Sequence, residues 1–126
     1  MNRLTFRAWQ GDRYIGVRDI LTALEDAVAS LQWRVRIDEM ASGPGPNRLQ
    51  DVSPDAWLDT SGLLDATAND VQVIDGQLSG YQSRESASPH IIVRAVDSTW
   101  WDIESDDDDV AQAVVNRLPN VVPMPQ

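Results

Sequence analysis

The chain has 126 residues, 42% of them hydrophobic, and a formal net charge of −10 from twenty acidic and ten basic residues. This length and hydrophobic content suit one domain with a sizeable core, so we expect residues 1–126 to form a single domain and exclude a largely disordered chain. The absence of cysteine excludes disulfides, thiolate catalysis and the common zinc clusters. The N-terminus lacks an apolar run of signal-peptide length and no segment approaches membrane-spanning length, so we expect a cytoplasmic protein without membrane contact.

The N-terminal half predicts two or three elements. Residues 4–9, with a continuation at 13–15, are typical of an opening strand or hairpin. Apolar residues then recur at helical spacing and predict an amphipathic helix over about 16–31. The residues of that stripe are Val17, Ile20, Leu21, Leu24, Val28 and Leu31. Next, Trp33, Val35 and Ile37 alternate with charged residues, which predicts a half-buried strand.

The segment at about 42–69 is rich in loop signals. Ser42-Gly-Pro-Gly-Pro-Asn47 is incompatible with regular structure. Ser53-Pro-Asp55 predicts a capped short helix that carries Trp57 and Leu58. A further helical turn with Leu63 and Leu64 follows a cap at Thr60 or Ser61.

The C-terminal half predicts two hairpins and a helix. Asp75-Gly76 separates Val71–Ile74 from Gln77–Tyr81, and Asp-Gly favours a tight turn. Asp97-Ser98 separates the strands 90–96 and 99–104. A helix over about 106–118 is stopped by Pro119, and a short strand at 121–122 follows. We therefore predict an α+β fold with an antiparallel or mixed sheet of four to six strands, the 16–31 helix on one face and the 106–118 helix near it.

The negative charge is concentrated in the C-terminal half. Residues 1–63 carry nine acids and seven arginines, whereas residues 64–126 carry eleven acids and three arginines. Such a surface is a poor partner for nucleic acid or an anionic membrane, and a better one for a basic protein.

The segment Asp97–Asp109 is the strongest candidate for a site. It holds seven carboxylates, two adjacent tryptophans and no basic residue. Strand alternation places Trp101 and Ile103 in the core and leaves Trp100 on the solvent side with two acids. We therefore predict a partner-binding patch in which acids attract a basic surface and aromatic rings anchor it. Its predicted members are Trp100, Asp102, Glu104, Asp106, Asp107, Asp108, Asp109, Trp57 and Tyr81.

A structural role explains part of the same acidic run. Ser105 is a good N-cap, and Asp106, Asp107 and Asp108 then lie in the first helical turn, where each carboxylate gains roughly 0.3–1 kcal/mol from the helix dipole. Ser105 and Asp108 together resemble a capping box. Asp109, Asp102 and Glu104 are left without such an explanation.

No catalytic or metal motif accompanies the patch. His90 is the single histidine, and a position at the surface or at a strand end is the expected one. The aspartate run lacks the spacing of an EF-hand loop, and Gly43 and Gly45 alternate with prolines that lack N–H donors for a phosphate. We expect no cofactor, no metal site and no enzymatic activity.

The best-supported function is therefore a non-enzymatic protein-binding domain that engages a basic partner. The profile (small, acidic, free of cysteine and of catalytic motifs) is similar to that of bacterial immunity proteins, which neutralise basic toxins; the resemblance implies an inhibitor or immunity-type role. Three alternatives stay open: a homo-oligomeric accessory subunit, such as a homodimer; a nucleic-acid mimic that blocks a DNA-binding protein; and an enzyme with Asp and Glu acid/base residues in a pocket, for which the sequence offers no pair to nominate.

Overall fold

The protein is built on a seven-stranded antiparallel sheet with the strand order β5-β4-β6-β7-β8-β1-β9. The computed structural model describes residues 2–41, 49–67 and 72–124. The strands are β1 (Asn2–Arg7), β4 (Gln32–Met40), β5 (Leu58–Asp59), β6 (Val73–Tyr81), β7 (Ile91–Val96), β8 (Trp100–Ser105) and β9 (Val122–Pro123), and a separate hairpin consists of β2 (Trp9–Gln10) and β3 (Arg13–Tyr14). The fold class is α+β, as predicted.

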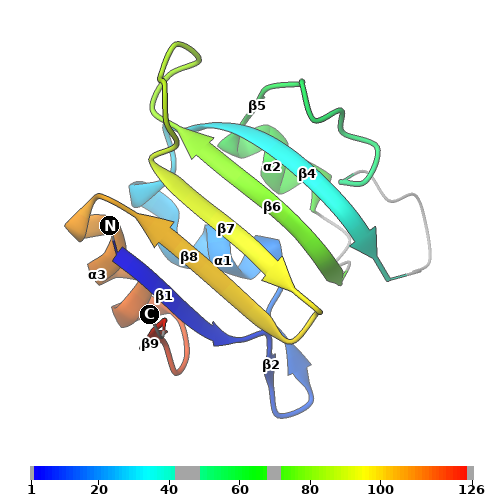
Figure 1. The fold of residues 1–126 in the computed structure, drawn as a ribbon, viewed down its shortest axis with the longest axis vertical. Helices are drawn as coiled ribbons and strands as arrows, with labels where there is room; N and C mark the ends of the chain where they lie inside the picture. The colour runs from blue at the N-terminus through cyan, green and yellow to red at the C-terminus, as the bar shows by residue number, and fades with distance from the viewer. Residues whose placement is uncertain (1, 42–48, 68–71, 125–126) are drawn as a thin grey trace.

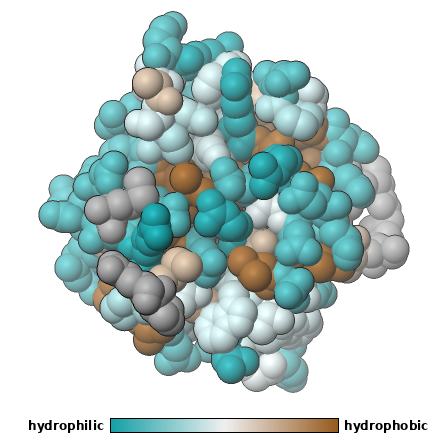
Figure 2. All heavy atoms as spheres, viewed as in Figure 1, coloured by the Kyte–Doolittle hydropathy of each residue, from teal (hydrophilic) through white to brown (hydrophobic). Residues whose placement is uncertain are grey.

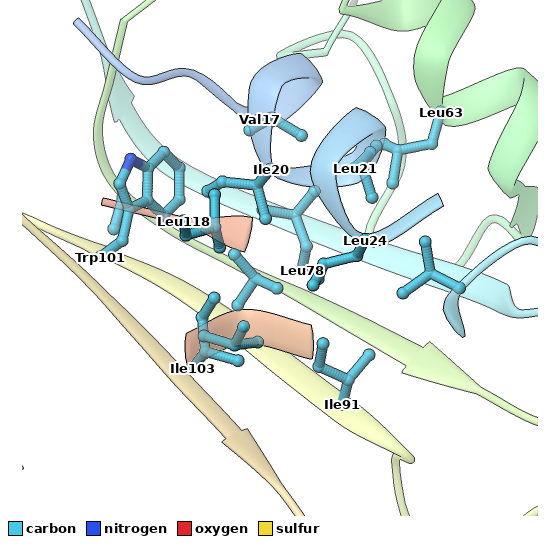
Figure 3. Packing of buried hydrophobic residues seen from close by; sticks show 14 of the residues in the cluster. Val17, Ile20, Leu21, Leu24, Leu63, Leu78, Ile91, Trp101, Ile103 and Leu118 are labelled. Carbon is cyan, nitrogen blue, oxygen red and sulfur yellow. The ribbon is translucent and has the colours of Figure 1, made fainter. Parts of the chain in front are cut away.

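The helices lie behind the strands in Figure 1, on one face of the sheet. They are α1 (Val17–Leu24), which runs into a 3₁₀ turn η1 (Glu25–Ala27), α2 (Thr60–Ala66) and α3 (Asp108–Arg117). Ile20 and Leu24 of α1 pack toward strand residues such as Leu78 and Ile103 (Figure 3). The hydrophobic core is this single layer between sheet and helices.

Strand β8 alternates as predicted. Trp101 and Ile103 are buried, whereas Trp100, Asp102 and Glu104 are only partly buried. The hairpin of β7 and β8 is also confirmed, with Asp97 and Ser98 at φ 51° and 52° in its turn. A positive φ at both central positions matches the right-handed twist of the two strands.

The first helix is shorter than predicted. It ends at Leu24 instead of about residue 31, because Glu25 has a φ of 36° and the chain continues as a 3₁₀ turn. Val28 and Leu31 are nevertheless buried, which explains why the apolar stripe continues past the end of the helix.

The predicted hairpin at Asp75-Gly76 is wrong. Gly76 lies inside the continuous strand β6, paired with Ile37 on one side and Ala95 on the other. A Cβ on Gly76 would lie 3.0 Å from the Arg36 carbonyl oxygen and 3.0 Å from Ile37 Cδ1. Glycine is therefore required here by the close approach of β4 at an irregularity in its register, and not by a turn.

The central segment and the sheet size also depart from prediction. The helix expected after Ser53 is absent, and Leu58 forms the two-residue strand β5 instead. Asp59 caps α2 through a hydrogen bond from the Gly62 amide (2.7 Å). With β5 and β9 counted the sheet has seven strands, more than the four to six expected. The predicted loop at 42–47 and the predicted strand residue Val71 lie outside the described residues.

The last helix begins two residues later than predicted. Its N-cap is Asp107, whose Oδ1 accepts a hydrogen bond from the Asp109 amide (2.8 Å). Ser105 is instead the buried last residue of β8, and its hydroxyl donates to the His90 carbonyl oxygen (2.7 Å). The capping box expected from Ser105 and Asp108 is therefore replaced by an aspartate cap.

Two buried indoles connect the sheet to the opposite layer. Trp101 Nε1 on β8 donates to the carbonyl oxygen of Ile15, just before α1 (2.7 Å). Trp33 Nε1 on β4 donates to the Thr60 hydroxyl of α2 (2.9 Å), which itself donates to the Val28 carbonyl oxygen (2.6 Å). A buried polar atom that loses its partner costs about 1–3 kcal/mol, so these bonds specify where each helix sits.

We expect Thr60→Val to lower the free energy of unfolding by about 1–3 kcal/mol, because it leaves the buried Trp33 N–H without an acceptor and removes the hydroxyl hydrogen bond to the Val28 carbonyl. Thr60→Ser keeps the hydroxyl and should cost clearly less. Urea unfolding of the three proteins measures this difference. Equal stability of the valine and serine variants would show that the hydroxyl bridge contributes nothing.

Arg117 connects the end of α3 to the end of α1. Its Nη1 lies 3.0 Å from Asp26 Oδ1 and 3.4 Å from the carbonyl oxygens of Ala23 and Leu24. The hydrogen bond and positive charge of Arg117 hold the pKa of the exposed Asp26 carboxyl below its ordinary value of 3.8.

We therefore expect Arg117→Gln to return the pKa of Asp26 toward 3.8. Because the pKa is lowered in the folded state, the contribution of this pair is present above the unfolded pKa and is lost as the pH falls through the folded one. Carboxyl-carbon NMR titration of Asp26 measures the pKa directly. Arg36→Gln removes an arginine from the other side of the sheet and is the matched control. An unchanged pKa of Asp26 in the Arg117 variant would contradict the assignment.

None of the helices described is long and apolar enough to span a membrane.

Candidate functional site

The face of the sheet opposite the helices, which we call the open face, is the candidate site. Figure 2 shows this face as largely hydrophilic, with small separate hydrophobic areas. Strand pairing aligns its side chains in rows. One row reads Arg34, Ser79, Ile92, Glu104, Arg3 and the next Arg36, Gln77, Arg94, Asp102, Thr5. No described helix covers these rows, so their side chains face solvent or a partner.

A connected polar network occupies the middle of the open face. Glu104 Oε1 lies 3.4 Å from Arg3 Nε and 3.7 Å from Arg94 Nη1. Arg94 also donates twice to Gln77 Oε1 (3.2 Å each), and Gln77 donates to Ser79 (3.1 Å). The Glu104 side chain is only 12% exposed and is thus held between two arginines. The charge of Glu104, a predicted member of the patch, is therefore compensated by two arginines of the same face.

A groove of about 370 Å³ lies beside this network, and we call it the Trp100 groove. Trp100 and Asp102 of β8 line it together with Thr5 of β1 and the end of the chain. The full lining is Thr5, Val96, Trp100, Asp102, Val122, Pro123 and Met124. The Arg7 guanidinium lies 4.8 Å from the centre of the Trp100 ring, so this indole is already in a cation–π contact.

The four aspartates Asp106–Asp109 form an acidic corner where β8 leads into α3. Asp107 Oδ2 lies 3.2 Å from His90 Nε2, and Asp108 accepts a hydrogen bond from Asn2 (3.0 Å). Within the described residues no arginine lies within ion-pair distance of Asp107, Asp108 or Asp109. Unlike Glu104, these three aspartates are therefore not neutralised by any arginine of the described chain.

Trp57 and Tyr81 form an aromatic corner on the β4–β6 side of the sheet. Their rings meet edge to face, with centroids 5.3 Å apart. Arg34 lies 4.3 Å and Arg84 6.0 Å from the Trp57 ring centre. The sequence suggested both aromatics as anchors but gave no sign of the two arginines that hold Trp57.

The structure thus brings some predicted site residues together and separates others. Trp100, Asp102 and Glu104 share the outer side of β8. Trp100 and Ser105 are five residues apart on an extended strand, about 16–17 Å, so the acidic corner lies at the far end of β8 from Trp100. Trp57 and Tyr81 lie beyond β7, on the β4 and β6 side of the sheet. The predicted patch is therefore three separate groups instead of one cluster.

The residues that sequence reasoning missed on the open face are arginines. Five of the ten in the chain point outward from its strands: Arg3, Arg7, Arg34, Arg36 and Arg94. The alternation of Arg34 and Arg36 with buried residues placed them outside, but their neighbours depend on the register of non-adjacent strands. The excess of negative charge consequently lies around the open face and not at its centre.

A second hollow, of about 580 Å³, lies on the helical side and is lined by three arginines. Each has a partner: Arg13 pairs with Asp19 (3.2 Å), Arg18 donates to the Leu64 carbonyl (2.9 Å), and Arg117 bonds to Asp26 and the end of α1. These contacts connect segments of the fold and account for the three side chains without a ligand.

The described part of the chain has no metal-binding cluster, because no three of its histidine and carboxylate side chains lie close enough together to hold an ion. His90 lies at the start of β7, with its side chain 18% exposed and directed at Asp107. Its contacts are those of a strand-end histidine.

In comparisons with known proteins, no family model, no curated protein and no solved structure matches the chain.

We expect Asp107→Ala to lower the free energy of unfolding by about 1 kcal/mol, because it removes the cap of α3. Asp107→Asn keeps an oxygen that can accept the Asp109 amide and should be close to wild type. Thermal and urea unfolding compare the two variants. An equal loss in both would mean that charge at this position, and not the cap, provides the stability.

Proposed function

We propose that this chain is a non-enzymatic protein-binding domain, of inhibitor or immunity type, that engages a basic partner protein through the open face of its sheet. The observation that carries the proposal is the arrangement along β8. A partly exposed tryptophan beside a groove lies at one end. Asp107, Asp108 and Asp109, with which no described arginine pairs, follow the other end.

The Trp100 groove supplies the anchor of the proposed interface. Binding energy at protein interfaces is concentrated in a few aromatic or arginine contacts that fill pockets and lose water. Trp100 is held by Arg7 and lies on a rigid strand, so ordering its side chain costs little when the partner binds.

The acidic corner supplies long-range attraction. The chain carries a net charge of −10, and Asp106–Asp109 concentrate part of it at the rim of the open face. Clustered charge mainly raises the rate of encounter with an oppositely charged surface and is screened by salt. The network around Glu104 contributes fixed hydrogen-bonding groups at the centre.

The proposal predicts separate kinetic effects for the two groups. Replacing Asp106, Asp107, Asp108 and Asp109 by Asn should slow association with the partner roughly tenfold at low salt and flatten its salt dependence. Trp100→Ala should instead speed dissociation, by roughly thirtyfold for a contact worth about 2 kcal/mol. Affinity capture from the lysate of the source cells provides the partner, and surface plasmon resonance with that protein measures both rates.

A matched control carries the same change in charge elsewhere. Asp12, Asp51, Asp55 and Asp65 are exposed and lie away from the acidic corner, so their fourfold Asn variant should keep most of the salt dependence. Equal slowing by both fourfold variants would show that the acidic corner acts only through the net charge of the chain. An association rate that is the same in the acidic-corner variant and in the wild type would contradict electrostatic steering.

One observation favours a second function, a homo-oligomeric subunit. In the described chain, β5 pairs with only Gln32 and Trp33 of β4, and no described strand pairs with the outer edge of β4 from Arg34 to Met40. An unpaired edge is a template for a strand of a second copy. Light scattering across protein concentration, with hydrogen exchange of residues 34–40, separates the two functions. A stable dimer with protected edge amides would favour the subunit, and a monomer at every concentration would exclude pairing of this edge.

A further inference from the structure

The two outward carboxylates of β8 differ in their surroundings. Glu104 is neutralised by Arg3 and Arg94. Asp102 Oδ1 accepts a hydrogen bond from the Thr5 hydroxyl (2.8 Å), but no arginine of the described chain lies within ion-pair distance of it. Arg94, its neighbour across the strand pair, is directed instead at Glu104 and Gln77. Asp102 is thus a partly buried carboxylate that retains an unneutralised charge.

Asp102 lines the Trp100 groove, whose other walls are mainly hydrocarbon. Val96, Val122, Pro123 and Met124 provide apolar surface, and Trp100 provides an aromatic ring. An apolar channel with one carboxylate matches an amphipathic side chain, in which a hydrocarbon stem carries a cationic head. A wholly apolar side chain would bury the Asp102 charge with only the Thr5 hydroxyl to compensate it, which is unfavourable.

The Trp100 ring already takes part in a contact of the relevant kind. The guanidinium of Arg7 lies 4.8 Å from its centroid. Arg34 and Trp57 repeat the arrangement on the same face, toward the β4 end of the sheet. The open face therefore pairs tryptophan with arginine in two places. A cation from outside would meet the same quadrupole, together with the charge of Asp102.

We propose that the Trp100 groove receives one arginine or lysine side chain of the basic partner, with the stem along Val122, Pro123 and Met124 and the cation at Asp102 beside Trp100. This inference rests on the proposed function, because it names what that partner inserts. It makes Asp102 the residue that selects a cationic side chain, whereas Asp106–Asp109 act on the encounter only.

The test uses small probes and needs no partner. Nα-acetyl-arginine methylamide is titrated into the full chain, and the indole N–H signals, assigned by Trp→Phe variants, are followed by NMR. The same titration uses the citrulline analogue, which has the shape of arginine without its charge, and the norleucine analogue, which has only the apolar stem. We expect saturable shifts at Trp100 with arginine. Citrulline should bind at least about tenfold more weakly, since one charge-assisted contact is worth at least about 1.4 kcal/mol.

Variants assign the effect to the groove. Asp102→Asn is isosteric and keeps an oxygen for Thr5, so it should fold normally and lose about tenfold in arginine affinity. Asp38→Asn, which alters the acid that pairs with Arg36 on β4, is the matched control and should leave arginine binding unchanged. Equal binding of norleucine and arginine, no saturable shift at Trp100, or an unaltered affinity in Asp102→Asn would each overturn the proposal.

The outcome is distinguishable from failure of the proposed function. Specific arginine binding without any captured partner would support the groove and count against the protein-binding role of the chain. A captured partner whose dissociation rate is unchanged by Asp102→Asn would support that role and overturn the groove assignment.

Discussion

Two indole N–H groups determine how the layers of this protein fit together. Trp33 and Trp101 are completely buried on the inner side of the sheet, where each must find an acceptor. Both acceptors belong to the helical layer: the Thr60 hydroxyl of α2 and the Ile15 carbonyl in front of α1. The helices are thereby fixed on one side, and the outward residues of the same strands form a surface without helices.

The open face follows from this one-sided arrangement. Strand side chains alternate between faces, so the polar partners of the buried residues are presented together in rows. A polar surface of this size is stable only when its charges satisfy one another, and the contacts among Arg3, Glu104, Arg94 and Gln77 do so. What remains for a partner lies at the margins, in the Trp100 groove, the acidic corner and the aromatic corner.

The sequence predicted the parts of the fold that have a strong period. The alternation of β4 and β8, the turn at Asp97-Ser98 and the outward position of Trp100 are all observed. The two-residue strand β5 has no period to detect, whereas the short strand predicted at 121–122 is observed one residue later as β9. The end of α1 was missed because a positive φ at Glu25 leaves no mark in the apolar pattern.

The candidate site was predictable only residue by residue. Exposure of Trp100 follows from local alternation, but the neutralisation of Glu104 requires β7, β8 and β1 to lie side by side. The Thr5 contact of Asp102 spans most of the chain, and no local pattern predicts it. The same holds for Arg34 and Arg84 at Trp57, which come from different segments. The register between strands that are distant in sequence, and not the composition, decides which charged side chains are left to interact with a partner.

The network at the centre of the open face has a consequence for how the surface can change. Strand β8, which carries Trp100, and strand β4, which carries Arg34, are three strand spacings apart, about 14 Å, and the intervening polar groups are bonded to one another. Substitutions in the groove and at the aromatic corner share no partner, so their effects on binding should add independently. Such a surface can alter its preference at one margin while the other is preserved, which allows specificity to diverge in small, separable steps.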